Sequence, residues 1–243
     1  MKNLSYLLVI LVLLMSACAT KEKAENKTVA KKEACSSCDD CKKSKSMITF
    51  KNEDFYKSNG EFDVDKAKEA VISLMKYHGY PVFPGLKESL WVSDYGTGQF
   101  TKLGLAANMF MNNEDDRYML MDLFLLPGQM LPEHWHLDAE PNPAKREGWL
   151  IRWGKSYVVG VGDDNLASYP DVKVPQVHMN GDVTTRHVVP ATPGMFVSLA
   201  EVYTRHWQFG GPEGAIITEV ANVHTDAAVR HSDQAINDNF LGK

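Results

Sequence analysis

Cysteine is scarce in this 243-residue chain, because all four cysteines lie within the first 41 residues and the remainder has none. A scaffold held together by disulfides is therefore excluded for the bulk of the chain. An excess of basic charge is also missing, since residues 47–243 hold 17 basic and 26 acidic side chains. This balance argues against nucleic-acid binding, which usually needs a basic face. No apolar run reaches the roughly 20 residues that cross a bilayer as a helix.

The N-terminus carries the features of an export signal. The apolar run from Leu4 to Met15 is too short to span a membrane and is typical of a signal peptide. Two small residues precede Cys18, as in a bacterial lipobox. We predict that residues 1–17 are removed and that lipidated Cys18 anchors a lipoprotein in the periplasm, at the outer membrane or on the cell surface. The alternative is an ordinary secretory signal peptide with a chance cysteine.

Residues 18–46 are predicted to be a flexible tether. They are rich in Lys, Glu, Ala and Ser, lack aromatic residues and cannot bury enough apolar area to fold. Three cysteines in this tether have spacing typical of a metal site: Cys35, Cys38 and Cys41. A closed structural zinc site needs four ligands, so one ligand is missing. A soft-metal or disulfide cluster and an incidental group of thiols both stay open.

Residues 47–243 are predicted to form a single all-β barrel with one N-terminal helix. Apolar residues at helical spacing indicate a helix over 63–76, with Asp63 as N-cap and Gly79 beyond its end. After residue 90, short apolar stretches alternate with turn residues, which is typical of strands. The expected strands are 90–95, 103–111, 117–126, 131–136, 147–153, 156–161, 185–190, 195–198, 204–209 and 214–221. Residues 163–184 form a long connection with irregular structure or an extra hairpin.

A His-x-His pair is the strongest functional signal. His134 and His136 share one face of an extended strand, because side chains alternate with a period of two. A carboxylate and the later His206 complete a divalent-metal site. Prolines follow Glu140, so Glu147 at the start of the next strand is the preferred ligand. The two motifs are laid out as in a cupin, a double-stranded β-helix or jelly-roll barrel.

Two further expectations concern the residues around this site. Three side chains lie at alternate positions after Glu147 on the same predicted strand, so they face the same side of the sheet as Glu147. They are expected to line the cavity beside the metal site: Trp149, Ile151 and Trp153. The other histidines have no partner at ligand spacing and are expected to be surface or hydrogen-bonded residues: His78, His178, His187, His224 and His231.

The chain resembles the cupin-type D-lyxose isomerases. The resemblance lies in the stretches 94–100, 126–136, 145–154 and 205–220, within about residues 60–230. It implies metal ligation, typically of manganese (Mn²⁺), by a set of four residues: His134, His136, Glu147 and His206. The implied activity is aldose–ketose isomerisation, such as D-lyxose with D-xylulose and D-mannose with D-fructose.

Isomerisation requires a group that carries a proton between two carbons. Glu219 is the candidate base, because it is the single acid in an apolar strand and burial raises the pKa of a carboxyl group. A place on the outer face of that strand is the alternative for Glu219. Lys145 is a further catalytic candidate that could hold sugar hydroxyls, together with Asp94 and Arg146.

The predicted partners are a small sugar, a membrane reached through the lipid on Cys18, and a second copy of the chain in a homodimer. Two other functions fit the same metal ligands. One is a metal-dependent cupin dioxygenase, and the other is a non-enzymatic surface module that binds sugar or metal.

Overall fold

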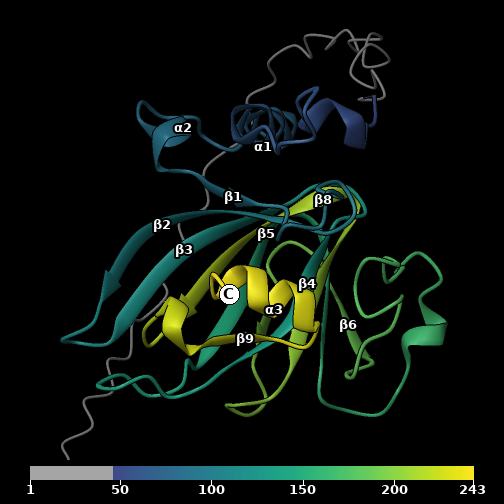
Figure 1. The fold of residues 1–243 in the computed structure, drawn as a ribbon. Coiled ribbons are helices and arrows are strands. Elements are labelled where there is room, and N and C mark those ends of the chain that lie inside the picture. Colours follow the sequence, from purple (N-terminus) through teal and green to yellow (C-terminus); the bar gives the residue numbers. More distant parts are fainter. Residues whose placement is uncertain (1–45) are drawn as a thin grey trace, which may run out of the picture. The chain divides into compact units, whose positions relative to one another are not determined.

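Nine strands join in one antiparallel sheet in the computed structural model, which describes residues 46–243 (Figure 1). The sheet curls into a barrel, and its main path runs in the order β1-β2-β3-β8-β4-β9, while β5 pairs with β6, β7 and β8. The prediction of an all-β barrel is confirmed. The strands are β1 (Trp91–Ser93), β2 (Leu105–Asn113), β3 (Tyr118–Leu125), β4 (Met130–His136), β5 (Glu147–Gly160), β6 (His187–Ala191), β7 (Phe196–Ser198), β8 (His206–Ala221) and β9 (Val229–His231).

Strands β5 and β8 are long, and each unites two strands that were expected to be separate. They pair along most of their length, with register shifts at Ile151/Trp153 and at Gly154/Ser156. Gly154 and Gly214 both have a φ of +71°, and a Cβ on Gly154 would collide with the carbonyl oxygen of Gly214. Glycine therefore allows the two strands to bend together without breaking, at positions where the sequence predicts strand ends.

The shift between Ile151 and Trp153 corrects the expectation that Trp153 lines the cavity. A β-bulge moves the following side chains to the other face of the sheet. Trp149 and Ile151 point to the inside of the barrel, but they are buried in its core and do not line the cavity either. Trp153 instead packs outside the barrel, with its ring centroid 5.5 Å from that of Tyr80.

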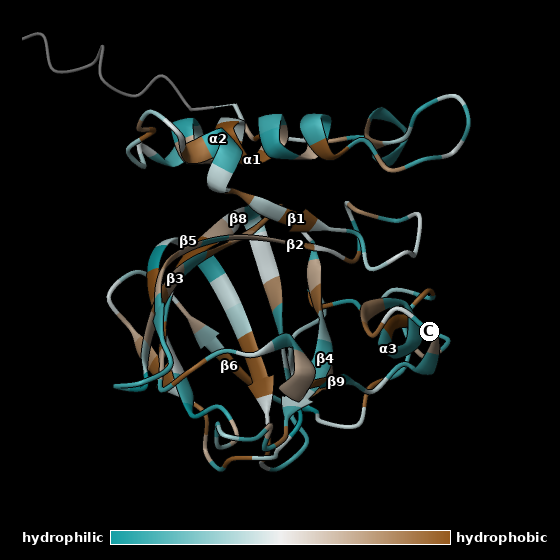
Figure 2. Ribbon diagram, turned by 60° about the vertical axis from the view of Figure 1, so that its left-hand side comes forward, coloured by the Kyte–Doolittle hydropathy of each residue, from teal (hydrophilic) through white to brown (hydrophobic). Residues whose placement is uncertain are grey.

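Helix α1 (Val64–His78) covers the outer face of the sheet, together with the short helix α2 (Leu86–Ser89) (Figure 2). Its N-cap is Asp63, whose side chain accepts the backbone N–H of Lys66, and it ends at Gly79 in the left-handed conformation. Both ends agree with the prediction. Val71 and Leu74 are fully buried against the sheet, and removing such a side chain typically costs about 2–5 kcal/mol.

A C-terminal segment completes one side of the barrel and was missed in the sequence. Strand β9 (Val229–His231) pairs with β4, and helix α3 (Gln234–Phe240) follows it. The Asp233 carboxylate caps α3 by accepting the N–H groups of Ala235 and Ile236. Helix α3 has only seven residues, so it offers too few turns for a detectable apolar period. The remaining elements are 3-10 helices η2 (Asn52–Phe55), η3 (Leu166–Ser168) and η4 (Asp226–Ala228).

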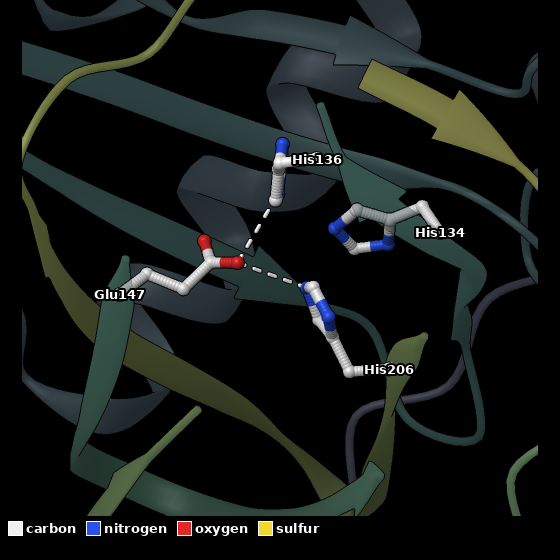
Figure 3. A group of neighbouring side chains, drawn as sticks. All are labelled: His134, His136, Glu147 and His206. Carbon is white, nitrogen blue, oxygen red and sulfur yellow. Dashed lines mark ion pairs between the residues drawn. The ribbon is translucent and has the colours of Figure 1, made fainter. Parts of the chain in front are cut away.

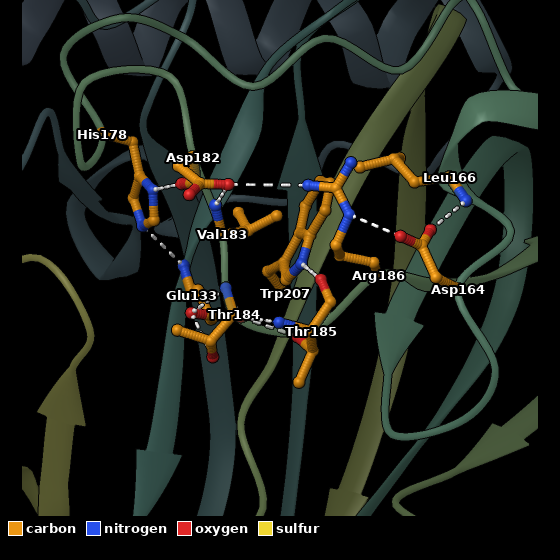
Figure 4. A network of polar contacts seen from close by, with 10 residues as sticks. All are labelled: Glu133, Asp164, Leu166, His178, Asp182, Val183, Thr184, Thr185, Arg186 and Trp207. Atoms are coloured by element: carbon orange, nitrogen blue, oxygen red, sulfur yellow. Dashed lines mark hydrogen bonds and ion pairs between the residues drawn. The ribbon is translucent and has the colours of Figure 1, made fainter.

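The connection over 163–184 is irregular, as expected, and a buried carboxylate holds its end to the barrel (Figure 4). Glu133 is fully buried and accepts hydrogen bonds from the backbone N–H and the hydroxyl groups of Thr184 and Thr185, at 2.7–3.1 Å. Burial would raise the pKa of Glu133, but hydrogen bonds from Ser232, Thr185 and Thr184 outweigh it and lower this pKa. Trp207 adds a bond from its indole N–H to the carbonyl oxygen of Thr185.

The predicted signal peptide, Cys18 and the cysteine cluster lie outside the described residues. Within residues 46–243, no helix has both the length and the apolar character needed to cross a membrane.

Candidate metal and active site

Three strands bring together three imidazoles and one carboxylate (Figure 3). His134 and His136 come from β4, His206 lies opposite His134 on β8, and Glu147 begins β5. Glu147 Oε1 lies 3.1 Å from His136 Nε2 and 3.0 Å from His206 Nε2. One possible ligand atom from each of the four residues lies within 4.8 Å of the others, and all four residues are buried.

Backbone carbonyl groups orient two of these imidazoles. His134 Nδ1 lies 2.8 Å from the carbonyl oxygen of Pro132, and His206 Nδ1 lies 3.1 Å from that of Thr204. A carbonyl oxygen only accepts, so each Nδ1 carries a hydrogen, and the neutral form of such a ring has its lone pair on Nε2. Burial lowers the pKa of His134 well below its usual value and lowers that of His136 to about 4. Neutral imidazoles of this kind are suitable metal ligands.

The buried polar atoms at the centre of this group fit a divalent metal ion. Among the described residues, no hydrogen bond satisfies His136 Nε2, His206 Nε2 or Glu147 Oε1. Buried polar atoms without a partner are unfavourable in a folded protein. A cation would satisfy all of them at once, and three nitrogen ligands with one oxygen ligand suit several transition metals. The structure places Glu140 on the exposed surface, so Glu147 is the carboxylate beside the histidines.

Lys145 connects the candidate metal ligands to Glu219. Its Nζ lies 2.9 Å from Glu147 Oε2 and forms an ion pair with Glu219 Oε1. Burial would lower the pKa of Lys145, but the two carboxylates raise it above its usual value. Trp149, opposite Glu219 in the β5–β8 ladder, donates its indole N–H to Glu219 Oε2 at 3.1 Å.

Glu219 has the properties of a proton acceptor. It is buried on the inner side of the barrel, which excludes the outward-facing alternative. Burial raises its pKa to about 7, the negative charge of Glu147 contributes to the increase, and Lys145 opposes it. At neutral pH, a carboxyl group with a pKa near 7 is partly deprotonated and can accept a proton. It is also more basic than an ordinary carboxylate, which favours removal of a proton from carbon.

A cavity of about 660 Å³ opens beside these groups, a volume typical of small-molecule sites. His134, His136, Lys145 and Glu219 line one part of it. Other parts are lined by apolar residues and by polar groups of the segment that follows β8, including His224, Asp226 and His231. The cavity therefore offers hydrogen-bonding groups at positions away from the candidate metal site.

Two residues expected at the site lie elsewhere. The carboxylate of Asp94 accepts a hydrogen bond from the hydroxyl of Tyr56 at 2.8 Å and the N–H groups of Gly96 and Gly98, so it stabilises a loop. Arg146 is exposed, because it alternates with the inward-facing Lys145 and Glu147. Neither Asp94 nor Arg146 lines the cavity.

Several residues of the cavity wall were not predicted, and His231 is the most deeply buried histidine among them. His231 was expected at the surface or in a hydrogen bond, but the structure buries it in the cavity wall, 5% exposed, opposite His134. The only signal in the sequence was the alternation Val229-Arg230-His231, which is too short to identify a strand. His178, by contrast, is hydrogen-bonded as expected, to the carbonyl oxygen of Asp182 and the N–H of Glu133.

Comparison with known proteins agrees with this geometry. The chain is 32% identical over 161 residues to the D-lyxose ketol-isomerase of Cohnella laeviribosi, covering 66% of this chain and 85% of that protein. It is 32% identical over 165 residues to the D-lyxose/D-mannose isomerase of Thermosediminibacter oceani, covering 67% and 86%. No protein-family model matches the chain.

Solved structures support the fold. The L-ribose isomerase of Acinetobacter sp. DL28 has a TM-score of 0.56 at 12% identity, and that of Cellulomonas parahominis has 0.53 at 15%. Each alignment covers 77% of this chain and 97% of the other. These isomerases have the cupin fold, so the predicted barrel type is confirmed.

Proposed function

Because this chain belongs to the D-lyxose ketol-isomerase family, whose members are aldose–ketose isomerases, we propose that it interconverts D-lyxose with D-xylulose and D-mannose with D-fructose. The observation that carries the proposal is the position of Glu219. Its carboxylate lines the same cavity as His134 and His136 and is held by Trp149 and Lys145.

The proposed reaction moves one proton between neighbouring carbons of the open-chain sugar. The Glu219 carboxylate removes the proton from C2 and returns it to C1, while the hydroxyl proton of O2 moves to O1. The sugar passes through an enediol between these two transfers. Between the two steps the proton is on the Glu219 carboxyl group, which is buried and lines the cavity.

His134, His136, Glu147 and His206 would hold the metal, and we propose Mn²⁺. When bound, it would act as a Lewis acid that polarises the carbonyl and C2 hydroxyl oxygens and so acidifies the C2 hydrogen. Lys145 then has two tasks. It holds Glu147 and Glu219 in position through its two ion pairs, and it remains close enough to the cavity to donate a hydrogen bond to a sugar oxygen.

The buried lysine between two carboxylates favours an isomerase over the alternatives. A dioxygenase acting on an apolar substrate has no need for a buried lysine between two carboxylates or for further hydrogen-bonding groups in the cavity wall. A binding module has no need for a buried base whose pKa is about 7.

The test is to load residues 18–243 with Mn²⁺ and incubate the protein with a panel of pentoses and hexoses, without oxygen. We expect D-lyxose and D-mannose to yield ketoses under these conditions. Turnover that depends on oxygen would support the dioxygenase instead. Sugar binding without any product would support the binding module.

We further propose that the mature protein begins at Cys18 and is held at a membrane by lipid. The lipobox-like residues before Cys18 support this placement, and the tether over 18–46 would separate the barrel of residues 47–243 from the membrane. The net positive charge of residues 19–46 suits anionic lipid head groups.

A homodimer is proposed as the assembly. Large apolar side chains are exposed on neighbouring strands β2 and β3, and such a patch is typical of an interaction surface: Phe110, Met111, Tyr118 and Leu120. Light scattering coupled to gel filtration would measure the mass in solution, and a monomeric mass would contradict the proposal.

A further inference from the structure

His231 is a buried polar side chain with no task in the reaction described above. Among the described residues, neither of its ring nitrogens has a hydrogen-bond partner, although the residue is only 5% exposed. An unsatisfied buried polar group typically costs about 1–3 kcal/mol. A neutral imidazole offers one donor and one acceptor, so His231 can bind a group that both donates and accepts hydrogen bonds.

The strand order sets the position of His231 relative to the candidate metal site. β4 lies between β8 and β9, with His134 opposite His206 on one side and opposite His231 on the other. Directly opposed residues in an antiparallel sheet project from the same face. The three histidines therefore form one row inside the barrel. The ring centroid of His134 is 4.3 Å from that of His206 and 5.8 Å from that of His231.

His231 stands outside the group that could hold a metal. Among the described residues, that group consists of His134, His136, Glu147 and His206. Neighbouring strands are about 4.8 Å apart, so β8 and β9 are separated by roughly 10 Å. His134 lies between them, and the His231 ring is one strand beyond this ligand, with 5.8 Å between the ring centroids. A sugar whose reacting carbons lie at the metal site would extend along this row toward His231.

Aromatic contacts hold the imidazole in place without using its nitrogens. Tyr95 and Phe240 pack against the ring at 5.2 Å and 5.1 Å between centroids, with interplanar angles of 67° and 68°. The backbone N–H of His231 donates to Asn237 Oδ1 at 3.0 Å, which joins β9 to α3. His231 and Phe240 both line the cavity. The ring is thus oriented, buried and adjacent to the space that a ligand would fill.

We propose that His231 binds a hydroxyl group of the sugar remote from C1 and C2, and that it is a specificity-determining residue for the reaction. The inference rests on the proposed function and adds a second contact point for its substrate. A hydroxyl group both donates and accepts, so it can satisfy either nitrogen. One contact at the reacting carbons and one at the far end would select sugars that carry a hydroxyl group at the right distance.

The first experiment uses His231→Phe, which keeps a planar ring but removes the hydrogen bond, and His231→Gln, which restores a donor and an acceptor. We expect His231→Phe to lower kcat/KM for D-lyxose about tenfold, mainly through KM, because a neutral hydrogen bond contributes about that factor. His231→Gln should recover most of the loss. His187→Phe is the matched control, since His187 lies outside the cavity.

The second experiment identifies the bound hydroxyl with analogues of D-lyxose that lack one hydroxyl group at C3, C4 or C5. For one analogue, the wild type should show the same tenfold loss, and His231→Phe should add nothing to it. If the loss from His231→Phe and the loss from the missing hydroxyl group multiply for every analogue, the two changes act independently and the proposal is overturned. Independent changes add in free energy, so their effects on kcat/KM multiply. Unchanged kinetics of His231→Phe would overturn it as well.

A binding assay separates this inference from the proposed reaction. D-arabinitol, obtained by reducing D-lyxose, cannot be isomerised, and its affinity is measured by calorimetry on Mn²⁺-loaded protein. We expect His231→Phe to bind it about tenfold more weakly at unchanged metal content and thermal stability.

If the wild type converts no aldose but still binds D-arabinitol about tenfold more tightly than His231→Phe, the proposed reaction fails and the role of His231 stands. Equal affinity, or no binding by the wild type, overturns the role. If His231→Phe fails to fold, His231→Leu takes its place.

Discussion

Replacing Glu219 with glutamine tests the centre of the proposed mechanism. The amide has nearly the volume of the carboxylate, and its carbonyl oxygen can still accept the indole N–H of Trp149. It cannot take up a proton from carbon, so general-base catalysis is lost. Such catalysis contributes about 10²- to 10⁴-fold, and we expect kcat for D-lyxose to fall by about that factor. This corresponds to about 3–5.5 kcal/mol in the activation barrier.

The structure also predicts what this substitution leaves intact. Glu147 remains 2.9 Å from Lys145, so the buried ammonium group keeps one of its two anionic partners. The candidate metal ligands are unchanged, and metal content measured by elemental analysis should equal that of the wild type. The free energy of unfolding should fall by no more than about 3 kcal/mol, because the buried lysine is not left without a counter-charge.

The assay follows ketose formation and, in deuterium oxide, the isotope at C1 of the product. Wild-type protein should introduce some solvent deuterium at C1, and Glu219→Gln should abolish both product and exchange. Glu140→Gln is the matched control, since Glu140 is exposed on a loop. A Glu219→Gln variant that keeps wild-type kcat at full metal content would refute the assignment of the base.

Four further predictions follow from the same structure. His134→Ala and His206→Ala should each lose bound divalent metal in elemental analysis, and full metal in both would refute the ligand assignment. Because burial raises the pKa of Glu219 to about 7, kcat/KM of the wild type should decrease as the pH falls through 7 and the base is protonated; a flat profile from pH 5 to 8 would contradict this. Glu133→Gln should lower the free energy of unfolding in urea by about 3 kcal/mol, through loss of hydrogen bonds to a buried charge. Cys18→Ser should move the protein from the membrane to the soluble fraction, and unchanged fractionation would refute the lipid anchor.

Local sequence patterns determined much of the fold. Helix α1 was predictable because its apolar period, its Asp63 cap and its terminal Gly79 all act within one segment. The His-x-His pair likewise follows from the alternation of side chains along a strand. The preference for Glu147 over Glu140 came from the prolines that follow Glu140, which delay the start of the next strand.

Only the tertiary structure decided the features that depend on strand pairing. The bulge beside Trp153 reverses the face of that side chain, and a bulge is a property of two paired strands rather than of one. The ion pair of Lys145 with Glu219 joins residues 74 positions apart in the chain. His231 enters the cavity because β9 pairs with β4, although three residues are too few for a periodic signal. Sequence periodicity reports which face of an element is buried, whereas the partner across the sheet is set by the packing of the whole barrel.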